Sequence, residues 1–396
     1  MKDTKTALVI GGGIAGPVTA MALRRAGIDA VVHEGHDGPA DGVGGMLGLA
    51  PNGFAALSQV GVGGLGEPVT SMVMRSWTGK RLAEFADPAG TPILHAVWRS
   101  DLYATLRAEA GRQGVKIEYG KRLVRVDDID DQVTAYFADG STATADILVG
   151  ADGIRSTVRG LITDVTPRYT GLLGFGGRPV RVPGLDTPDR TMNMLYGKHA
   201  FFGHGTFADG RTGWYANLPR RSPIPLAEAA ALGPAHWLDV IRAEFAADRT
   251  AAPRVLAHAR PDDLVIVGAL EDLPTVPVWS RGRVVLVGDA AHATSPSSGQ
   301  GASLAAESAV ELARCLRDLP HADAFAAYER LRRPRVERVI AAGARASSAK
   351  AAGPLASVVR DLTMPLAMRL LARPGKLAWQ YDHRIDWDAP VHSGPR

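Results

Sequence analysis

The sequence predicts an α/β fold with two domains, one Rossmann-like and one built on an inserted, mostly antiparallel sheet, followed by a C-terminal helix. Three observations predict it. An apolar strand at 7–10 runs into a glycine-rich turn and a helix. Two later segments, 146–153 and 283–289, repeat the order of buried strand, glycine turn and acid. Between these two, residues 169–281 show the alternating patterns of a twisted sheet.

The first glycine-rich turn fits a dinucleotide. Residues 11–16 match G-x-G-x-x-G, in which Gly11 permits the tight turn, Gly13 lets the backbone approach a pyrophosphate and Gly16 allows the helix to pack on the strand. A second apolar strand ends at Glu34, where an acid can accept hydrogen bonds from both hydroxyls of an adenosine ribose. The alternative is an ordinary glycine-rich turn. A second match at 61–66 follows a helical pattern and begins no helix, so we expect a loop there.

The segment 283–301 fits a flavin. Its apolar strand ends in Gly288-Asp289, and Gly299-Gln300-Gly301 opens an alanine-rich helix. A carboxylate after the strand can accept from a sugar hydroxyl, and glycines at a helix start let backbone N–H groups face an electron-rich ligand edge. The ribityl chain and the pyrimidine ring of a flavin need these two contacts.

With Gly150-Ala151-Asp152-Gly153 and the stretch 97–102, these segments resemble, in order and spacing, the single-component FAD-dependent aromatic monooxygenases. Within this para-hydroxybenzoate hydroxylase-like family the chain is most similar to compact tetracycline-modifying and antibiotic-tailoring hydroxylases. The resemblance runs from residue 5 to about 345. It implies a glutathione-reductase-type ββα FAD-binding domain formed by 1–71, 96–168 and 282–345. It also implies a substrate domain formed by 72–95 and 169–281, and a C-terminal helical brace at 346–396.

The resemblance also implies which residues hold FAD. Glu34 would contact the adenosine ribose, Asp289 and Arg99 the ribityl chain, and Asp152 the sugar and diphosphate, while Pro296 would lie against the ring. The backbone of Gln300 would add a donor to the pyrimidine end. The full expected set is Gly11, Gly13, Ile14, Ala15, Gly16, Glu34, Gly45, Met46, Arg99, Leu123, Asp152, Asp289, Pro296, Gly299, Gly301 and Ala302.

Two positions depart from the family pattern. The family often has Glu-Asp where this chain has Glu307-Ser308, and it often has Arg where this chain has Gly35-His36. These departures leave the contacts at the adenosine end less defined than those at the flavin ring.

The activity implied by the resemblance is a cycle in one active site. NADPH or NADH reduces bound FAD, O2 adds to the reduced flavin, and the flavin hydroperoxide inserts one oxygen atom into an aromatic or polyketide-like small molecule. Hydroxylation in secondary metabolism or antibiotic modification is expected. Epoxidation, Baeyer–Villiger oxidation and a non-catalytic, flavin-bound ligand-sequestering protein stay open as alternatives. A flavin halogenase is disfavoured because its Trp-x-Trp-x-Ile-Pro string is absent.

The sequence identifies no catalytic side chain. His204, Tyr215 and His199 lie in the predicted substrate sheet, and each could serve as a base for a phenolic substrate. Local packing or hydrogen bonding accounts for each of them equally well.

Composition limits the classes of protein to which this chain can belong. The 396 residues are 46% hydrophobic, ample for a large core, and the net charge of +4 comes without a recognisable nucleic-acid module. The densest basic cluster, at 330–335, is expected at the surface. Cys315 is the single cysteine, which excludes an intramolecular disulfide and fits a reducing cytoplasm; no metal site is expected. We expect a cytoplasmic monomer or homodimer without a signal peptide or a membrane span.

Overall fold

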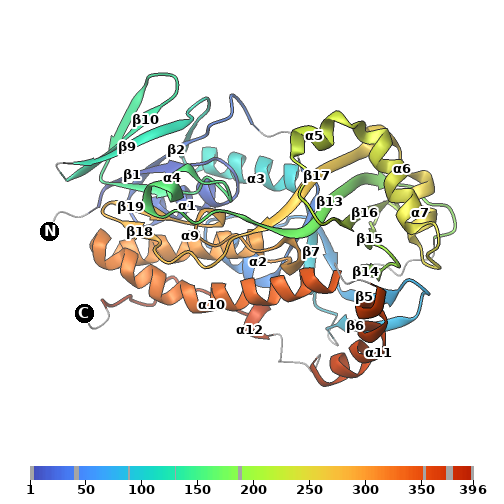
Figure 1. Cartoon of the computed structure of the whole chain (residues 1–396). Coiled ribbons are helices and arrows are strands. Elements are labelled where there is room, and N and C mark those ends of the chain that lie inside the picture. The colour runs from blue at the N-terminus through green and yellow to red at the C-terminus, as the bar shows by residue number, and fades with distance from the viewer. Residues whose placement is uncertain are drawn as a thin grey trace.

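The computed structural model describes residues 4–39, 44–87, 90–129, 131–185, 190–350, 354–371 and 378–393. In these ranges the chain forms a six-stranded and a seven-stranded sheet, with two three-stranded sheets beside them. Helices cover both large sheets (Figure 1). The predicted α/β fold is confirmed.

The six-stranded sheet is parallel except at one edge strand. Its strands are apolar because the sheet is covered on both faces: all of Ile147–Gly150 is buried, as are four residues of Thr6–Ile10. The carboxyl ends of the parallel strands therefore meet at one edge. In spatial order the strands are β18 (Ser280–Arg281, antiparallel), β19 (Val284–Leu286), β12 (Ile147–Gly150), β1 (Thr6–Ile10), β2 (Asp29–His33) and β8 (Lys116–Glu118).

Small residues let the helices of this domain pack closely. Helices α1 and α9 pack against each other, and α2 and α3 pack on α9 and α1 respectively. Nine residues of α1 and thirteen of α9 are buried, so both helices belong to the core. The helices are α1 (Ala15–Arg25), α2 (Pro51–Ser58), α3 (Arg99–Arg112), α4 (Thr157–Ile162), α8 (Asp289–His292) and α9 (Gly301–Asp318).

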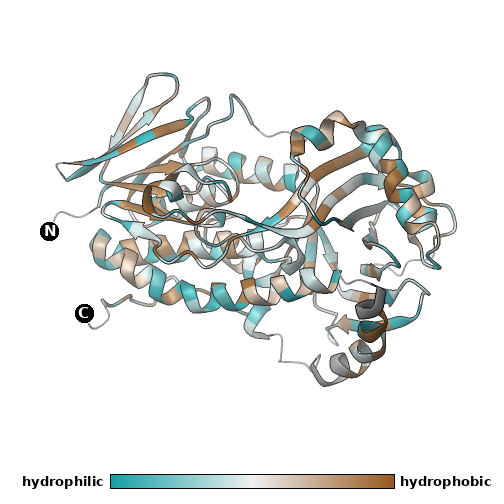
Figure 2. Ribbon diagram, viewed as in Figure 1, coloured by the Kyte–Doolittle hydropathy of each residue, from teal (hydrophilic) through white to brown (hydrophobic). Residues whose placement is uncertain are grey.

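The seven-stranded sheet is antiparallel except for the parallel pair β14–β5. Helices α5 (Leu226–Ala231), α6 (Gly233–Phe245) and α7 (Ala252–His258) cover its outer face (Figure 1). Apolar strands β13 and β17 appear brown beside these helices (Figure 2). In spatial order the strands are β17 (Leu264–Asp272), β13 (Arg168–Val180), β16 (Thr212–Pro219), β15 (Phe201–Thr206), β14 (Thr191–Tyr196), β5 (Ser71–Ser76) and β6 (Arg81–Ala86).

The two small sheets are antiparallel. One lies between the large sheets and consists of β3 (Met46–Leu49), β7 (Leu94–Trp98) and β4 (Glu67–Val69). The other, a β9–β10 hairpin with β11, projects at one end of the molecule (Figure 1). It consists of β9 (Leu123–Ile129), β10 (Gln132–Phe137) and β11 (Thr142–Ala145). The glycine-rich stretch before β4 is the loop that was expected.

Helix α10 (His321–Lys350) links the two large sheets (Figure 1). It packs on α9, on the one-turn helix η2 (Pro296–Ser298) and on β13, so the expected domain boundary at residue 345 falls inside it. Beyond it, α11 (Pro354–Leu371) packs on β6, and α12 (Ala378–Tyr381) lies near α2. In the described ranges no helix combines the length and apolar character needed to cross a membrane.

The expectation that the basic cluster 330–335 lies at the surface is wrong for part of it. The Arg332 guanidinium is 1% exposed and forms an ion pair of 2.6 Å with Glu307 on α9, itself 1% exposed. Arg335 adds a second pair to the same carboxylate at 2.8 Å. The cluster is buried here because α10 packs on α9 and turns these two side chains inward.

Candidate active site

In the glycine turn after β1, two positions have no room for a Cβ atom, and a third faces open space. Gly11 has φ of 107°, and a Cβ there would lie 2.5 Å from the Ala151 carbonyl oxygen. A Cβ on Gly16 would lie 1.8 Å from the Gly11 carbonyl oxygen. A Cβ on Gly13 would meet nothing within 4 Å, and α1 begins without a side-chain cap. The turn therefore offers exposed backbone and a helix start, which suits a pyrophosphate.

Glu34 follows β2 and lies against this turn. Its Oε2 accepts a hydrogen bond from the Gly12 N–H at 2.6 Å, and its Oε1 accepts from the His36 N–H at 2.8 Å. These bonds fix the carboxylate at the carboxyl edge of the sheet. Each oxygen keeps a lone pair for a further donor, such as a ribose hydroxyl.

Asp152 follows β12 at the same edge. Its two oxygens accept from the Ser156 hydroxyl and, at 3.1 Å, from the Val158 N–H, so the side chain caps the start of α4. Burial raises the pKa of Asp152 despite these hydrogen bonds. The structure thus gives Asp152 a helix-capping role that the sequence did not indicate.

Asp289 follows β19, and its side chain is exposed. The surrounding protein nevertheless desolvates the Asp289 carboxylate and so raises its pKa, while the charge of Arg99 opposes that shift. Asp289 is therefore surrounded by protein and still reaches solvent at the carboxyl end of β19.

The phenol of Tyr103 on α3 shows that these groups converge. Burial is the main cause that raises its pKa, and the charges of Asp289 and Glu34 raise it further while Arg99 lowers it. The charges of three expected FAD-binding residues therefore act on the pKa of one phenol. The structure brings Glu34, Arg99 and Asp289 into one electrostatic neighbourhood.

The loop from Pro296 to Gly301 leads into α9. Pro296 begins η2, Gly299 adopts a left-handed φ of 62°, and a Cβ on Gly299 would meet nothing within 4 Å. Gln300 is the residue before α9, and its side chain makes no hydrogen bond to the first turn of that helix. The helix start at Gly301 and Ala302 is therefore open to a ligand. The exposed backbone and the helix start fit the pyrimidine end of a flavin.

The sequence did not predict the hydrogen bonds that support this loop. The buried Asn52 Nδ2 donates to Gln300 Oε1 at 2.9 Å and to Glu307 Oε1 at 2.6 Å. Gln300 Nε2 is buried without a hydrogen-bond partner among the described residues. Asn52 follows Pro51 at the start of α2, and no local pattern marks it as a contact of residues some 250 positions away.

Of the remaining expected FAD-binding residues, Ile14 and Ala15 form the start of α1, and three others lie in two further places. The Gly45 carbonyl oxygen accepts from the Arg99 N–H at 3.2 Å, and Met46 pairs with Trp98 in the small central sheet, so both lie beside Arg99. Leu123 begins β9 and is buried in the core of the first domain.

The inner face of the seven-stranded sheet is apolar and turned toward the first domain. Tyr215 donates to Met194 Sδ at 3.2 Å, and a Cβ on Gly213 would lie 3.7 Å from Met46 Sδ. Tyr215, Met194 and Met46 remain partly exposed, so a ligand can reach this face. The residues that share it are Met72, Met74, Met192, Met194, Phe201, Gly203, Gly205, Gly213, Tyr215 and Asn217.

The three candidate bases lie in different environments. His204 lies on the opposite face of the sheet, where it packs near Phe202, and burial lowers its pKa to about 4. His199 is exposed in the turn between β14 and β15. Tyr215 lies on the inner face, where burial raises its pKa. The structure therefore brings only Tyr215, of these three, to the face near Met46.

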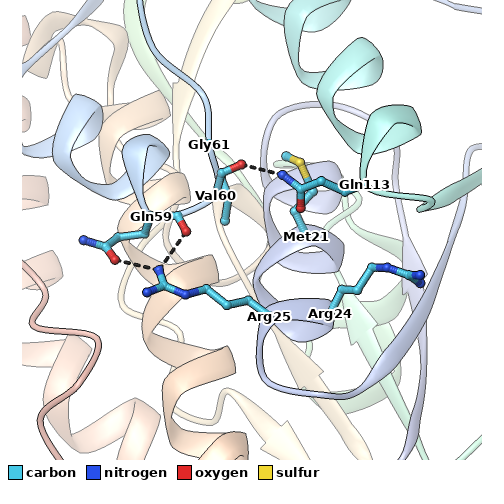
Figure 3. Close-up of a pocket in the computed structure, with 7 residues that line it drawn as sticks. All are labelled: Met21, Arg24, Arg25, Gln59, Val60, Gly61 and Gln113. Carbon is cyan, nitrogen blue, oxygen red and sulfur yellow. Dashed lines mark hydrogen bonds between the residues drawn. The ribbon is translucent and has the colours of Figure 1, made fainter.

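Two cavities lie elsewhere. The larger, of about 390 Å³, is lined by the C-terminal end of α1, by Gln59–Gly61 and by Gln113 (Figure 3). Arg25 donates to the Gln59 carbonyl oxygen at 2.8 Å, which closes one side. Because α1 runs away from the carboxyl ends of the strands, this cavity lies at the opposite edge from Glu34 and Asp289. The second, of about 250 Å³, lies between the start of β13 and α10.

Comparison with known proteins agrees with this geometry. A family model described as "FAD binding domain" matches residues 3–171 and 274–342. The 3-amino-4-hydroxybenzoate 2-monooxygenase of Streptomyces cremeus is 32% identical over an alignment of 354 positions that covers 84% of each chain.

Solved structures share the fold. The Klebsiella pneumoniae protein HpxO, complexed with FAD and uric acid, superposes with a TM-score of 0.81 at 26% identity, covering 92% of this chain and 94% of that one. The tetracycline destructase Tet(55) has a TM-score of 0.71 at 23% identity over the full length of both chains, which shows a common fold alone. The chain therefore belongs to the FAD-binding-domain family and, within it, to the single-component FAD-dependent monooxygenases.

Proposed function

We propose that this monooxygenase takes electrons from NADPH or NADH and inserts one oxygen atom from O2 into a small aromatic or polyketide-like molecule. The observation that carries the proposal is that Glu34 and Asp289 lie at the carboxyl edge of one parallel sheet, with Arg99 at the start of α3 within electrostatic reach of Asp289. An apolar, partly exposed face of a second sheet lies beside that edge. Ligands of open α/β sheets bind at this edge, and domain boundaries favour small-molecule sites.

Each residue at the edge is assigned to a different part of FAD. We assign the pyrophosphate to the turn at Gly13 and the ribose to Glu34, whose free lone pairs face away from its two backbone bonds. Asp289 and Arg99 would hold the ribityl chain, and the open start of α9 would face the pyrimidine end. Bound FAD would supply the redox chemistry with O2, while the chain supplies position, charge and protection from water.

The substrate would lie against the inner face of the seven-stranded sheet. Methionines adapt to flat ring surfaces, and the glycines on β15 and β16 give room to the rings of Tyr215 and Phe207, which lie over this face. The relatives support a planar, acidic substrate, since one is named for an aminohydroxybenzoate and one was solved with uric acid. Hydroxylation is the reaction we propose, with Tyr215 the one candidate base on this face.

The test is made on purified protein. Its visible absorption spectrum is recorded, and oxidation of NADPH and NADH is followed with phenols, hydroxybenzoates, anthraquinones and tetracyclines. We expect a yellow protein whose NAD(P)H oxidation rises with one compound class and yields a product heavier by one oxygen atom. A flavin-loaded protein that never transfers oxygen to any of these compounds would contradict the proposal.

A further inference from the structure

A lysine that the FAD-binding pattern does not account for lies at the end of α10. Gly343 and Ser347, on the same helix, contact the loop of Pro296: a Cβ on Gly343 would lie 2.9 Å from Ser298 Cβ, and the Ser347 and Ser295 hydroxyls form a hydrogen bond. Lys350 follows Ser347 by one helical turn, on the same side of α10. The helix thereby carries this side chain from the FAD-binding loop to the substrate sheet.

The ammonium of Lys350 lies on the inner face of that sheet. Its Nζ is 3.5 Å from Asn217 Oδ1, 4.1 Å from the centre of the Phe201 ring and 5.9 Å from the centre of the Tyr215 ring. Phe201 and Asn217 pair across β15 and β16, so the three groups form one patch. The ammonium contacts the same side of the sheet as the partly exposed Met194.

The position is costly for a cation. Lys350 is only 9% exposed, and among the residues that the structure describes no carboxylate forms a salt bridge with it. Burying an unpaired charge destabilises a protein unless some partner compensates. Contacts with two aromatic rings and one long hydrogen bond compensate only in part.

Among the described residues, Lys350 makes one side-chain hydrogen bond. An ammonium has three N–H groups, and one of them points to Asn217. Asn217 is itself fixed, since its Nδ2 donates to the Ala216 carbonyl oxygen at 3.1 Å and its Oδ1 is turned to the lysine. Burial lowers the pKa of Lys350 to about 7, so an arriving anion would favour the charged form.

We propose that Lys350, oriented by Asn217, is a specificity-determining residue that receives an anionic oxygen group, a carboxylate or phenolate, on the ring of the substrate. The inference rests on the proposed function, since it assigns the inner face to the substrate. The methionines and glycines of that face carry no formal charge. Arg360 lies over the Tyr196 ring of the same face but is paired with Asp361, whereas Lys350 has no salt bridge among the described residues. An apolar surface with a single placed charge is the usual form of a small-molecule site.

The test measures binding, not turnover. Flavin-loaded protein is titrated by calorimetry with 4-hydroxybenzoate, salicylate and 3-amino-4-hydroxybenzoate, each compared with its neutral amide. We expect the wild type to bind at least one acid about tenfold more tightly than its amide. In Lys350→Met this preference disappears while amide affinity stays within about twofold, and in Lys350→Arg it persists.

Two controls separate recognition from folding. Lys198→Met removes a lysine from the exposed turn before β15 and should leave the preference unchanged. Asn217→Ser keeps Lys350 but removes the amide that orients its ammonium, and should weaken the preference for the acid over the amide without removing it. Bound flavin and melting temperature are recorded for every variant.

The proposal is overturned if no acid is preferred over its amide by the wild type, or if Lys350→Met keeps the preference. If Lys350→Met fails to fold, Asn217→Ser decides, and an unchanged preference in that variant also overturns it. A preference that depends on Lys350 in a protein that transfers no oxygen would contradict the proposed function and leave the anchor standing.

Discussion

At the scale of single residues, two glycines of the turn after β1 have different roles: Gly16 is needed for folding, and Gly13 is expected to be needed for binding FAD. Gly16→Ala places a methyl group against the Gly11 carbonyl oxygen, and we expect it to destabilise the protein by roughly 1–3 kcal/mol. Gly13→Ala meets no protein atom, so the melting temperature of the flavin-free protein should not change. Its affinity for FAD should fall by about tenfold or more, because the methyl group would occupy the space assigned to the pyrophosphate.

Melting curves of flavin-free protein and fluorescence titrations with FAD distinguish the two glycines. If Gly13→Ala binds FAD as the wild type does, the pyrophosphate does not lie at this turn.

The ribityl assignment depends on Asp289. Asp289→Ala removes an acceptor at the strand edge that lies within electrostatic reach of Arg99, and we expect FAD affinity to fall by about tenfold. The flavin retained after gel filtration, measured by its absorbance per protein, reports this loss. Asp239→Ala on α6, where the carboxylate is 77% exposed, is the matched control and should retain its full flavin. Equal flavin in both variants would refute the assignment.

At the scale of elements, the ion pairs of Glu307 hold α9 to α10. Glu307→Gln leaves the buried Arg332 guanidinium without its anion, and we expect a loss of about 3–5 kcal/mol in the free energy of unfolding. Glu337→Gln breaks the more exposed pair of Glu337 with Arg333 on α10 and should cost about 0–1 kcal/mol. Urea denaturation measures both, and a similar small loss in the two variants would show that the buried pair is dispensable.

The same helices show where the sequence was informative and where it was not. The strand at 7–10, the turn after it and Glu34 were predictable because their requirements are local: apolar runs, backbone angles and a fixed spacing. The pairing of Arg332 with Glu307 depends on how α10 packs on α9, and a run of arginines is also typical of a solvated face.

The substrate sheet shows a second limit. Alternation within 169–281, as at 206–207 and 212–215, predicts a sheet, but it does not say which side of each strand faces the ligand. The pairing of β15 with β16 and the contact with Met46 decide this, and they turn Tyr215 inward and His204 outward. Lys350 was equally hidden, because only the packing of α10 brings its ammonium to Asn217.

At the scale of the whole molecule, neutral buried histidines make both domains sensitive to acid. Burial lowers the pKa of His292 in the first domain to about 3, with Arg332 adding to the shift, and that of His204 in the second domain to about 4. Both values lie below the 6.5 of an unfolded histidine. Between the folded and unfolded values the unfolded chain binds more protons, so stability is complete above pH 6.5 and is lost as the pH falls toward 4.

We therefore expect the free energy of unfolding to fall between pH 6.5 and 4, with each of the two histidines contributing about 1.4 kcal/mol per pH unit. His204→Gln removes one contribution, so its slope against pH should be shallower than that of the wild type by about this amount. His392→Gln, at an exposed position near the C-terminal end of the described chain, should keep the wild-type slope. Urea denaturation at pH 7.5, 6 and 5 gives the three slopes. A His204→Gln slope equal to the wild-type slope would mean that this histidine is already charged in the folded protein, although its buried Nδ1 has no hydrogen-bond partner among the described residues.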